Sequence, residues 1–227
     1  MRKTNFSHID KIHVLHEMLL LAQRYEAKTF VETGAHLGMT SLFMAASGHF
    51  DRIHAVELSD DLYECIKQDL PAIAEENHID MSRAVFWHGD AVDCLPQILN
   101  RTEERCVFWL DAHSAGDGRE LSELGDCVLE HELAAIGEHS VKDHVIVIDD
   151  MSYCRDGLSD YPSVERVIRM VQKINPEYCI TVKYNALWAE VPSTSRAAHL
   201  LVADGKGGFE LRPNLILREI SRGRHDR

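Results

Sequence analysis

Short apolar runs alternate with amphipathic segments along most of the chain, and this alternation most limits the fold that the chain can adopt. The runs are KTFVET (28–33), RIHAVEL (52–58), AVFWHG (84–89), RCVFWLD (105–111) and HVIVIDD (144–150). Amphipathic stretches such as DDLYECIKQDLPAIAEEN separate them. Nearly continuous apolar strands connected by helices are typical of a parallel sheet that is covered on both faces. The sequence therefore predicts an α/β fold with a doubly wound, mostly parallel sheet.

The two ends of the chain add a helix and an antiparallel edge to this core. Residues 8–25 have apolar side chains at helical spacing, and Ser7 is a candidate cap. A further helix, SVERVIRMVQKIN, follows Pro162, and the strand candidates 178–185 and 197–203 come after it. The turn DGKGG and the run FELRP then complete a hairpin pattern. The sequence thus predicts an antiparallel C-terminal edge of the sheet.

The chain length fits one domain. A chain of 227 residues can bury the core of one large α/β domain. We therefore expect a single domain over 1–227, with an N-terminal helical cap at 1–27 and a frayed tail at 219–227. The segment 112–142 is expected to be a lid and helix insertion, because HSAGDGRELSELGDC is rich in Gly, Ser and Asp.

Charge and composition exclude several classes of partner. The formal net charge is -13, which argues against nucleic acid or an anionic membrane as a partner. The six cysteines form no CxxC pair, and we expect reduced core thiols. No apolar run approaches the ~18 residues of a membrane span, and the first residues lack the apolar core of a signal peptide. The expected protein is soluble and cytoplasmic.

The stretch VETGAHLGMTS (31–41) predicts a strand, a glycine turn and a helix. Gly34 would permit a tight turn or a positive φ, and Gly38 would let a ligand or the next helix approach closely. The N–H groups at the start of the following helix point toward whatever lies over the turn. The turn by itself leaves two interpretations open, a ligand site or a simple connection.

Acidic residues near two later strand ends favour a ligand site. Glu57 ends the second run about 20 residues after Gly34, where a carboxylate can accept hydrogen bonds from ribose hydroxyls. Asp90 follows the third run, where it can accept from an adenine amino group. The glycine pattern G-x-x-x-G departs from the dinucleotide fingerprint, and Glu32 disfavours a diphosphate and favours a positively charged ligand.

These residues together resemble the class I S-adenosylmethionine-dependent methyltransferases. The resemblance covers the chain from about Phe30 to Ala203. It implies a Rossmann-like sheet with strand order 3-2-1-4-5-7-6 and an antiparallel seventh strand. It also implies the cofactor S-adenosylmethionine, with contacts from Glu32, Gly34, Gly38, Glu57 and Asp90.

Three carboxylates end the fourth and fifth apolar runs. Asp111 ends RCVFWLD, and Asp149 and Asp150 end HVIVIDD. The carboxyl ends of neighbouring parallel strands line one crevice, so these side chains can converge there and would then need a cation. Oxygen ligands favour Mg²⁺, with Mn²⁺ or Ca²⁺ as alternatives. The alternative is that Asp149 and Asp150 only cap the next turn.

The acidic pattern resembles the metal-dependent O-methyltransferases of the catechol and macrocin types. That resemblance implies that Asp111, Asp149 and Asp150 hold a divalent ion that acidifies the acceptor hydroxyl. The catechol enzymes have a lysine three residues after the first aspartate, where this chain has Ser114. His113 is the candidate base instead, with Asp111 beside it as the second catalytic residue, although His113 could simply hydrogen-bond within its loop.

Two other sets of candidate residues carry weaker signals. His13, His16 and Glu17 have metal-ligand spacing, but a solvated helix face is the favoured interpretation. Glu132 in EHELAAI could face the crevice or solvent.

The function that these patterns favour is methyl transfer from S-adenosylmethionine to a hydroxyl of a small molecule or saccharide, assisted by a divalent metal. The run FWLDAHSAG, with ELAAI and VIVIDD after it, also resembles a bacterial group of such enzymes associated with surface polysaccharides. The alternatives are an NAD-linked oxidoreductase on a similar sheet and a non-catalytic binding module. A homodimer is possible.

Overall fold

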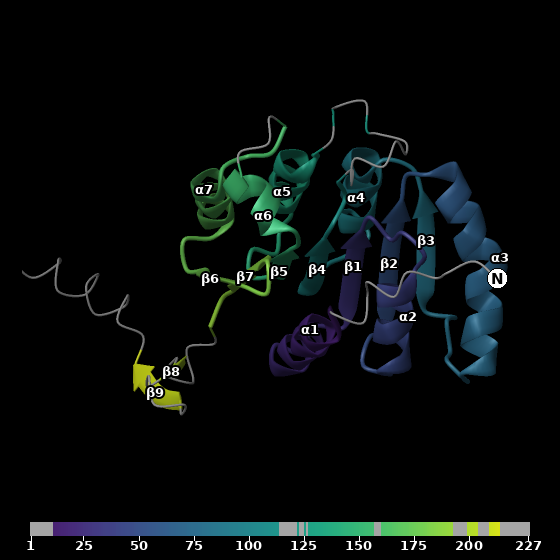
Figure 1. Ribbon diagram of the computed structural model, residues 1–227, viewed down its shortest axis with the longest axis horizontal. Coiled ribbons are helices and arrows are strands. Elements are labelled where there is room, and N and C mark those ends of the chain that lie inside the picture. The colour runs from purple at the N-terminus through teal and green to yellow at the C-terminus, as the bar shows by residue number, and fades with distance from the viewer. Residues whose placement is uncertain are drawn as a thin grey trace, which may run out of the picture. The chain divides into compact units, whose positions relative to one another are not determined.

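A seven-stranded sheet forms the centre of the structure (Figure 1). The computed structural model describes residues 11–113, 122, 125, 127–156, 160–192, 199–203 and 209–213. By its internal contacts the chain separates into two compact units, Met1–Val191 and Pro192–Arg227. The first contains the seven-stranded sheet, and the second contains a two-stranded sheet. The single domain with its cap, lid and tail stays a prediction, and residues 219–227 lie outside the described residues.

Helices and strands alternate along most of the chain, almost as the apolar pattern predicts. The elements are α1 (Ile12–Arg24), β1 (Thr29–Thr33), α2 (Met39–Ala46), β2 (Arg52–Glu57), α3 (Asp60–Glu76), β3 (Ala84–His88), α4 (Ala91–Leu99), β4 (Cys106–Leu110), α5 (Leu129–Glu138), β5 (Val145–Ile148), α6 (Met151–Asp156), α7 (Val164–Ile174), β6 (Cys179–Lys183), β7 (Ala186–Glu190), β8 (His199–Ala203) and β9 (Phe209–Pro213). The predicted cap Ser7 and the turn at 204–208 lie outside the described residues.

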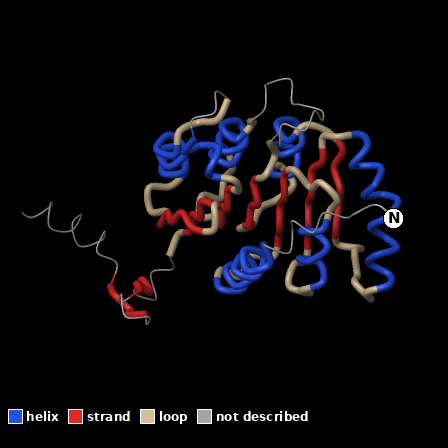
Figure 2. The backbone as a smooth tube through the Cα atoms, in the orientation of Figure 1, coloured by secondary structure: helices blue, strands red, loops and turns tan. Residues whose placement is uncertain are grey.

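The strand order in the main sheet is β3-β2-β1-β4-β5-β7-β6 (Figure 2). The first five strands of this order are parallel, and β7 is antiparallel to both of its neighbours. The strands β1, β4 and β5 are buried along their whole length, whereas the edge strands β3 and β6 are partly exposed. The predicted fold class is therefore confirmed, including the order that the resemblance implied.

Helices cover both faces of the sheet. Alternate residues of each central strand pack in opposite directions, so that Phe30 contacts the cluster containing α1 while Val31 contacts the cluster containing α4 and α5. The helices α1, α2 and α3 thus cover one face, and α4, α5, α6 and α7 cover the other (Figure 1). No helix among the described residues is both long and apolar enough to cross a membrane.

The C-terminal hairpin differs from the prediction in its position. The strands β8 and β9, on either side of the predicted GKGG turn, do pair antiparallel, but they form a separate two-stranded sheet. The antiparallel edge of the main sheet is instead the hairpin of β6 and β7. No strand was predicted at the position of β7, because the strand expected after 178–185 was placed at 197–203.

The turn between β6 and β7 explains this difference. Tyr184 and Asn185 have φ values of 55° and 59°, which is the left-handed pair of a tight two-residue hairpin turn. Asparagine tolerates this conformation, but tyrosine rarely adopts it, so the residues at this position do not indicate a turn. The Asn185 carbonyl accepts a hydrogen bond from Met151 N–H at 2.8 Å, and its side-chain oxygen accepts from Ser152 N–H at 2.8 Å. These bonds tie the turn to the start of α6.

The expectations for the N-terminal helix and for the cysteines are each confirmed only in part. The buried stripe of α1 is formed by Val14, Leu15, Met18, Leu21 and Ala22, while Ile12 is 51% exposed although its spacing suggested the core. All six cysteines are free thiols, but only three of them are buried, namely Cys94, Cys106 and Cys154.

A pair of histidines, one of them buried, lies at the end of the sheet opposite the carboxyl ends of β4 and β5. His144 is fully buried, and its Nδ1 accepts a hydrogen bond from Cys106 N–H at 3.0 Å. Its Nε2 lies 2.9 Å from His139 Nδ1, and His139 Nε2 lies 2.7 Å from the Thr102 carbonyl oxygen. Because Nδ1 of His144 must accept, Nε2 donates to His139, which in turn donates to Thr102. Both rings are therefore neutral in this arrangement.

This pair should make stability depend on pH. Burial, with repulsion from His139, lowers the pKa of His144 to about 3, against roughly 6.5 in an unfolded chain. We expect the free energy of unfolding to be highest above about pH 6.5 and to fall as the pH drops toward 3, because the unfolded chain then binds a proton that the folded chain excludes. Urea denaturation at a series of pH values measures this slope.

A His144→Asn variant should flatten that slope, since asparagine can still accept from Cys106 N–H but does not titrate. His131→Asn, at an exposed position of α5, is the matched control and should keep the wild-type slope. An unchanged slope in His144→Asn would assign the pH dependence to other groups.

Candidate active site

Gly34 shapes the turn that follows β1. Its φ is +78°, and a Cβ built on it would lie 2.3 Å from the Asp111 carbonyl oxygen. Its N–H donates to the Val56 carbonyl oxygen at 3.0 Å. The turn is therefore held between the ends of β2 and β4, at a distance that only glycine allows.

Gly38 has a packing explanation. Its φ is +72°, and a Cβ would lie 2.8 Å from Leu70 Cδ2 and 3.1 Å from the Phe86 ring. The glycine thus lets the start of α2 approach α3 and β3. This is the interpretation in which the next element approaches closely, and a cofactor contact of Gly38 stays a prediction.

Glu32 is a buried carboxylic acid directly before this turn. It is 1% exposed, and its Oε2 accepts a hydrogen bond from the Ser41 hydroxyl at 2.7 Å. Burial raises its pKa to about 8, and the nearby Asp111 and Glu57 add to the rise although Ser41 and Thr40 oppose it. A cationic group bound beside Glu32 would restore the carboxylate, because opposite charges favour ionisation.

Glu57 and Asp90 both carry structural hydrogen bonds. The Glu57 carboxylate accepts from His36 N–H at 2.6 Å and from Ser59 N–H at 2.9 Å. Asp90 caps α4 and accepts from Val92 N–H at 2.9 Å. These bonds orient both carboxylates at successive strand ends, and the ribose and adenine contacts stay predictions.

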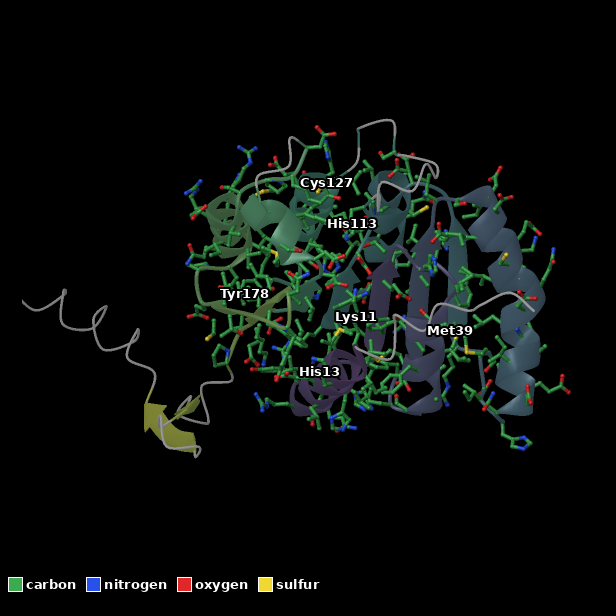
Figure 3. The ribbon with its side chains drawn as sticks, viewed as in Figure 1. Lys11, His13, Met39, His113, Cys127 and Tyr178 are labelled. Carbon is green, nitrogen blue, oxygen red and sulfur yellow. The ribbon has the colours of Figure 1, made fainter. Side chains whose placement is uncertain are left out.

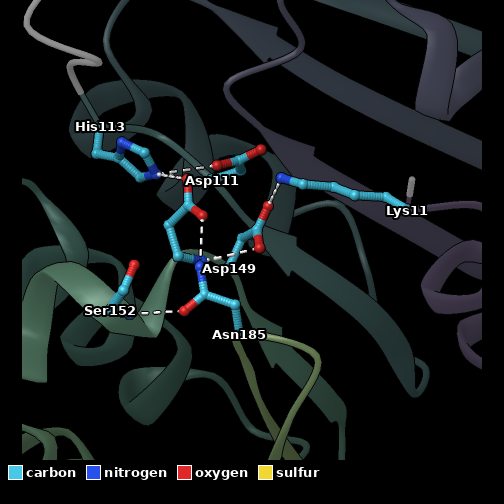
Figure 4. A network of polar contacts seen from close by, with 7 residues as sticks. Lys11, Asp111, His113, Asp149, Ser152 and Asn185 are labelled. Carbon is cyan, nitrogen blue, oxygen red and sulfur yellow. Dashed lines mark hydrogen bonds and ion pairs between the residues drawn. The ribbon is translucent and has the colours of Figure 1, made fainter. Parts of the chain in front are cut away.

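The strand ends of β4 and β5 bring two aspartates and a histidine together (Figure 4). His113 Nε2 lies 3.1 Å from Asp111 Oδ1 and 3.3 Å from Asp150 Oδ2. One ligand atom from each of these three residues lies within 4.8 Å of the others. Both contacts are within ion-pair distance, but neither has the alignment of a hydrogen bond. The imidazole thus occupies the space between the two carboxylates.

Asp149 has a different partner. Its side chain is 2% exposed and forms an ion pair with Lys11, as Figure 4 shows. Its Oδ1 accepts from Asp150 N–H at 2.8 Å, so Asp149 also serves the turn that was the alternative interpretation. The trio expected from the sequence is therefore not the one that the structure groups, because His113 stands where Asp149 was expected. A metal-binding role of Asp149 stays a prediction.

Lys11 was not anticipated as a site residue. It directly precedes α1 (Figure 3), and its Nζ lies 5.6 Å from the centre of the Trp109 ring in addition to its contact with Asp149. Burial lowers its pKa, but Asp111 and Asp149 outweigh that effect and the net shift is upward. No local pattern could have revealed this pair, since it joins residues from opposite parts of the chain.

The charges of the cluster depend on one another. The two carboxylates raise the pKa of His113 to about 10 even though burial lowers it, so the metal-free cluster holds an imidazolium at neutral pH. The contact with His113 lowers the pKa of Asp150. Burial and Asp111 raise the pKa of Asp149 to about 6 in spite of Lys11. An imidazolium cannot accept a proton, so the base role of His113 stays a prediction that requires a neutral ring.

Glu132 of α5 faces the interior beside this cluster. It is 1% exposed, and its Oε1 has no hydrogen-bond partner among the described residues. Burial raises its pKa to about 7, against the lowering effect of His113. From the sequence, the Glu132 side chain could face either the crevice or solvent. Its place on the apolar stripe of α5, between Leu129 and Leu133, was the feature that could have indicated burial.

A hollow of about 290 Å³ connects Glu132 to the cluster. Its polar lining includes Glu132, His113, Asp149 and Asp150. The rings of Tyr153 and Tyr161 stand edge-on to the His113 ring at centroid distances of 5.2 Å and 6.0 Å. The histidine is thus enclosed on the side away from the sheet.

Two remaining expectations concern flanking segments. In the predicted lid, 114–121, 123–124 and 126 lie outside the described residues, while His113 and Cys127 form a bridge at its base. On α1, the His13 ring contacts Tyr184 and Glu17 pairs with Lys183, and His16 is exposed. The favoured interpretation of a solvated helix face therefore holds for these positions.

Adding a methyl group at Gly34 should be much more costly than adding one at another left-handed glycine. Gly34→Ala should lower the free energy of unfolding by roughly 3 kcal/mol or more, because strain at positive φ adds to the clash with Asp111. Gly48→Ala is the matched control: φ is +64° there but no atom lies within 4 Å of the added Cβ, so only about 1 kcal/mol is expected. Chemical denaturation compares the two, and equal losses would contradict the close approach of β4.

Comparison with solved structures gives a consistent set of neighbours. An O-methyltransferase from Bacillus cereus in complex with SAH has a TM-score of 0.55 at 19% identity, and the match covers 80% of this chain and 81% of that one. TomG from Streptomyces achromogenes, an O-methyltransferase in complex with SAM, has a TM-score of 0.52 at 17% identity over 80% of each chain. The SAH-bound methyltransferase PaMTH1 from Podospora anserina has a TM-score of 0.52 at 14% identity over 84% of each chain.

The similarity to these proteins lies in the structure and not in the sequence. No protein-family model matches the sequence, and no curated protein matches it. The identities to the solved structures are low, so these neighbours establish the fold and leave activity and ligands to the site itself. The predicted resemblance is confirmed at that level, and the chain has the fold of the class I O-methyltransferases.

Proposed function

We propose that this protein is an S-adenosylmethionine-dependent O-methyltransferase that acts on a hydroxyl of a small molecule or saccharide. The observation that carries the proposal is the adjacency of two features at one edge of the sheet. One is the glycine turn with its buried Glu32, and the other is the group of Asp111, His113 and Asp150 at the next two strand ends. The fold shared with SAM- and SAH-bound O-methyltransferases supports it.

The order of acidic groups along the sheet matches the parts of this cofactor. Asp90, Glu57 and Glu32 follow β3, β2 and β1, which are neighbours in that order. An adenine, a ribose and a cationic amino-acid end would meet them in turn. NAD carries a diphosphate, which a buried Glu32 and the G-x-x-x-G turn disfavour.

The reaction requires a hydroxyl close to the sulfonium methyl group. The hydroxyl oxygen forms a bond to the methyl carbon as the sulfur–methyl bond breaks, and the sulfur keeps the electron pair. The hydroxyl proton passes to a group at the site, for which His113 is the candidate when its ring is neutral and its Nε2 does not bind a metal. The protein mainly holds the two reactants in line, and Asp111 lies between the glycine turn and the acceptor side.

The residues at the ends of β4 and β5 also fit a divalent metal. Two carboxylates and an imidazole offer atoms within 4.8 Å of one another, and the unpartnered Glu132 Oε1 lines the adjoining hollow. Asp111, His113 and Asp150 would hold the ion. When bound, a divalent ion lowers the pKa of an acceptor hydroxyl. The imidazole also admits Mn²⁺ or a later first-row ion beside Mg²⁺.

A proton and a metal would compete for His113. The two carboxylates favour the imidazolium form, whereas a metal ligand must be a neutral imidazole. Metal binding should therefore release a proton and weaken as the pH falls.

Calorimetry with S-adenosylhomocysteine and with NAD⁺ tests the cofactor. Because Glu32 disfavours a diphosphate and the glycine turn lacks the dinucleotide pattern, we expect saturable binding of S-adenosylhomocysteine and none of NAD⁺. NAD⁺ binding alone would favour the oxidoreductase alternative. Cofactor binding without methyl transfer to any hydroxyl acceptor in a chemically varied panel would favour the non-catalytic alternative.

Substitution of single carboxylates tests the metal site. Asp111→Asn and Asp150→Asn should weaken Mn²⁺ binding at least about 10- to 100-fold, because each removes a ligand charge. Asp149→Asn is the matched control and should stay near wild type, because Lys11 already holds that carboxylate. Titration calorimetry of Mn²⁺ in two buffers of different ionisation enthalpy measures both the affinity and the released proton.

The opposite ranking would restore the trio expected from the sequence. If Asp149→Asn loses Mn²⁺ binding and His113→Gln does not, then Asp149 is the ligand and the imidazole is not. If none of the variants changes Mn²⁺ binding, this group is not a metal site.

A further inference from the structure

A second hollow lies between the start of α1 and the glycine turn. Its empty space, including the part open to solvent, is about 500 Å³. Its ionisable lining residues include Lys11, Glu32 and Asp111, and Gly34 and Trp109 form further parts of the wall.

This hollow carries charge of both signs. Lys11 is the only lysine or arginine among the described residues that line it, while Glu32 and Asp111 are carboxylic acids. Glu32 is fully enclosed, and its known partner is the Ser41 hydroxyl. A ligand group with one ammonium and one carboxylate would satisfy both sides, because each charge would meet its opposite.

Lys11 has donors left for such a ligand. An ammonium group has three N–H donors, and the ion pair with Asp149 engages one side of it. Its Nζ is also held over the Trp109 ring, so the side chain is already oriented toward the sheet. At 35% exposure it reaches both the hollow and solvent.

The geometry points to Lys11 as the residue that binds the α-carboxylate of the cofactor's amino-acid end, opposite Glu32 and Asp111, which take its ammonium group. This inference rests on the proposed function, because it assigns one end of the proposed cofactor. The strand order supports the assignment: if adenine and ribose lie over β3 and β2, the amino-acid end comes over β1 and β4. The hollow lies there, since Glu32 belongs to β1 and Asp111 follows β4.

The same contact would join the two halves of the site. Lys11 would bridge the cofactor carboxylate and Asp149, which follows β5 on the acceptor side. Because Lys11 precedes α1 directly, cofactor binding would also fix the start of that helix over the sheet. Lys11 is thus a positioning residue with respect to the methyl transfer.

Two nucleosides that differ only in the amino-acid end test this inference. S-adenosylhomocysteine has the α-carboxylate and the ammonium group, and 5′-methylthioadenosine has neither. Lys11→Met should weaken binding of S-adenosylhomocysteine about 10- to 100-fold, the usual effect of losing a hydrogen bond to a charged group, and leave binding of 5′-methylthioadenosine unchanged. Lys11→Arg keeps the positive charge and should therefore retain much of the wild-type affinity for S-adenosylhomocysteine. Calorimetry measures the dissociation constants of both nucleosides for the wild type and the two variants.

Lys183→Met is the matched control. Lys183 forms an ion pair with Glu17 of α1, so its loss also weakens the attachment of that helix, but Lys183 does not line the hollow. We expect Lys183→Met to bind both nucleosides as the wild type does.

The possible results separate the inference from the proposed function. If Lys11→Met loses affinity for both nucleosides equally, or for neither, Lys11 does not bind the carboxylate and the inference is overturned. The same holds if the wild type binds both nucleosides equally well. If the wild type binds neither nucleoside, the proposed function fails as well.

Discussion

The close approach of β4 to the turn after β1 is the constraint on which the site depends. Gly34 lies so near the Asp111 carbonyl that a single methyl group would separate the strands. Backbone bonds continue this alignment, because Asp111 N–H donates to the Thr33 carbonyl oxygen at 3.1 Å and Asp149 N–H donates to the Leu110 carbonyl oxygen at 3.0 Å. These bonds hold the ends of β1, β4 and β5 next to one another at the same edge of the sheet. The cofactor side and the acceptor side consequently meet at Asp111.

Fixing the strand ends in this way forces like charges together, and the chain supplies two cations of its own. Lys11 pairs with Asp149 from one face of the sheet, and His113 lies between Asp111 and Asp150 on the other. Each of these three aspartates therefore has a positively charged neighbour without any ligand. Burying three uncompensated carboxylates would be costly. These cations also mark where ligands would act, since a metal replaces a proton on His113 and a cofactor carboxylate approaches Lys11.

The fold was largely predictable because its signals are local. Apolar strands, glycine turns and acidic strand ends each occupy a few consecutive residues, and parallel packing then dictates that the carboxyl ends converge. The failures arose where a distant contact decides the structure. The strand β7 was missed because a tyrosine adopts the left-handed conformation at the hairpin turn, which a bond network to α6 supports. Lys11 was missed because nothing near it in the sequence indicates Asp149. The position of Glu132 was left open, because a single acid on an apolar stripe is ambiguous.

The grouping of His113 with Asp111 and Asp150 also depends on contacts that local sequence patterns do not show. The sequence places Asp149 and Asp150 side by side, but successive residues at a strand end point in different directions. Asp150 has a φ of +50° and turns toward His113, where Asn185 Nδ2 donates to its Oδ1 at 2.9 Å, while Asp149 stays in the direction of α1. Adjacent charges in a sequence therefore need not share a ligand. In this chain both aspartates line the hollow that contains Glu132, but Asp150 contacts His113 whereas Asp149 pairs with Lys11 at the start of α1.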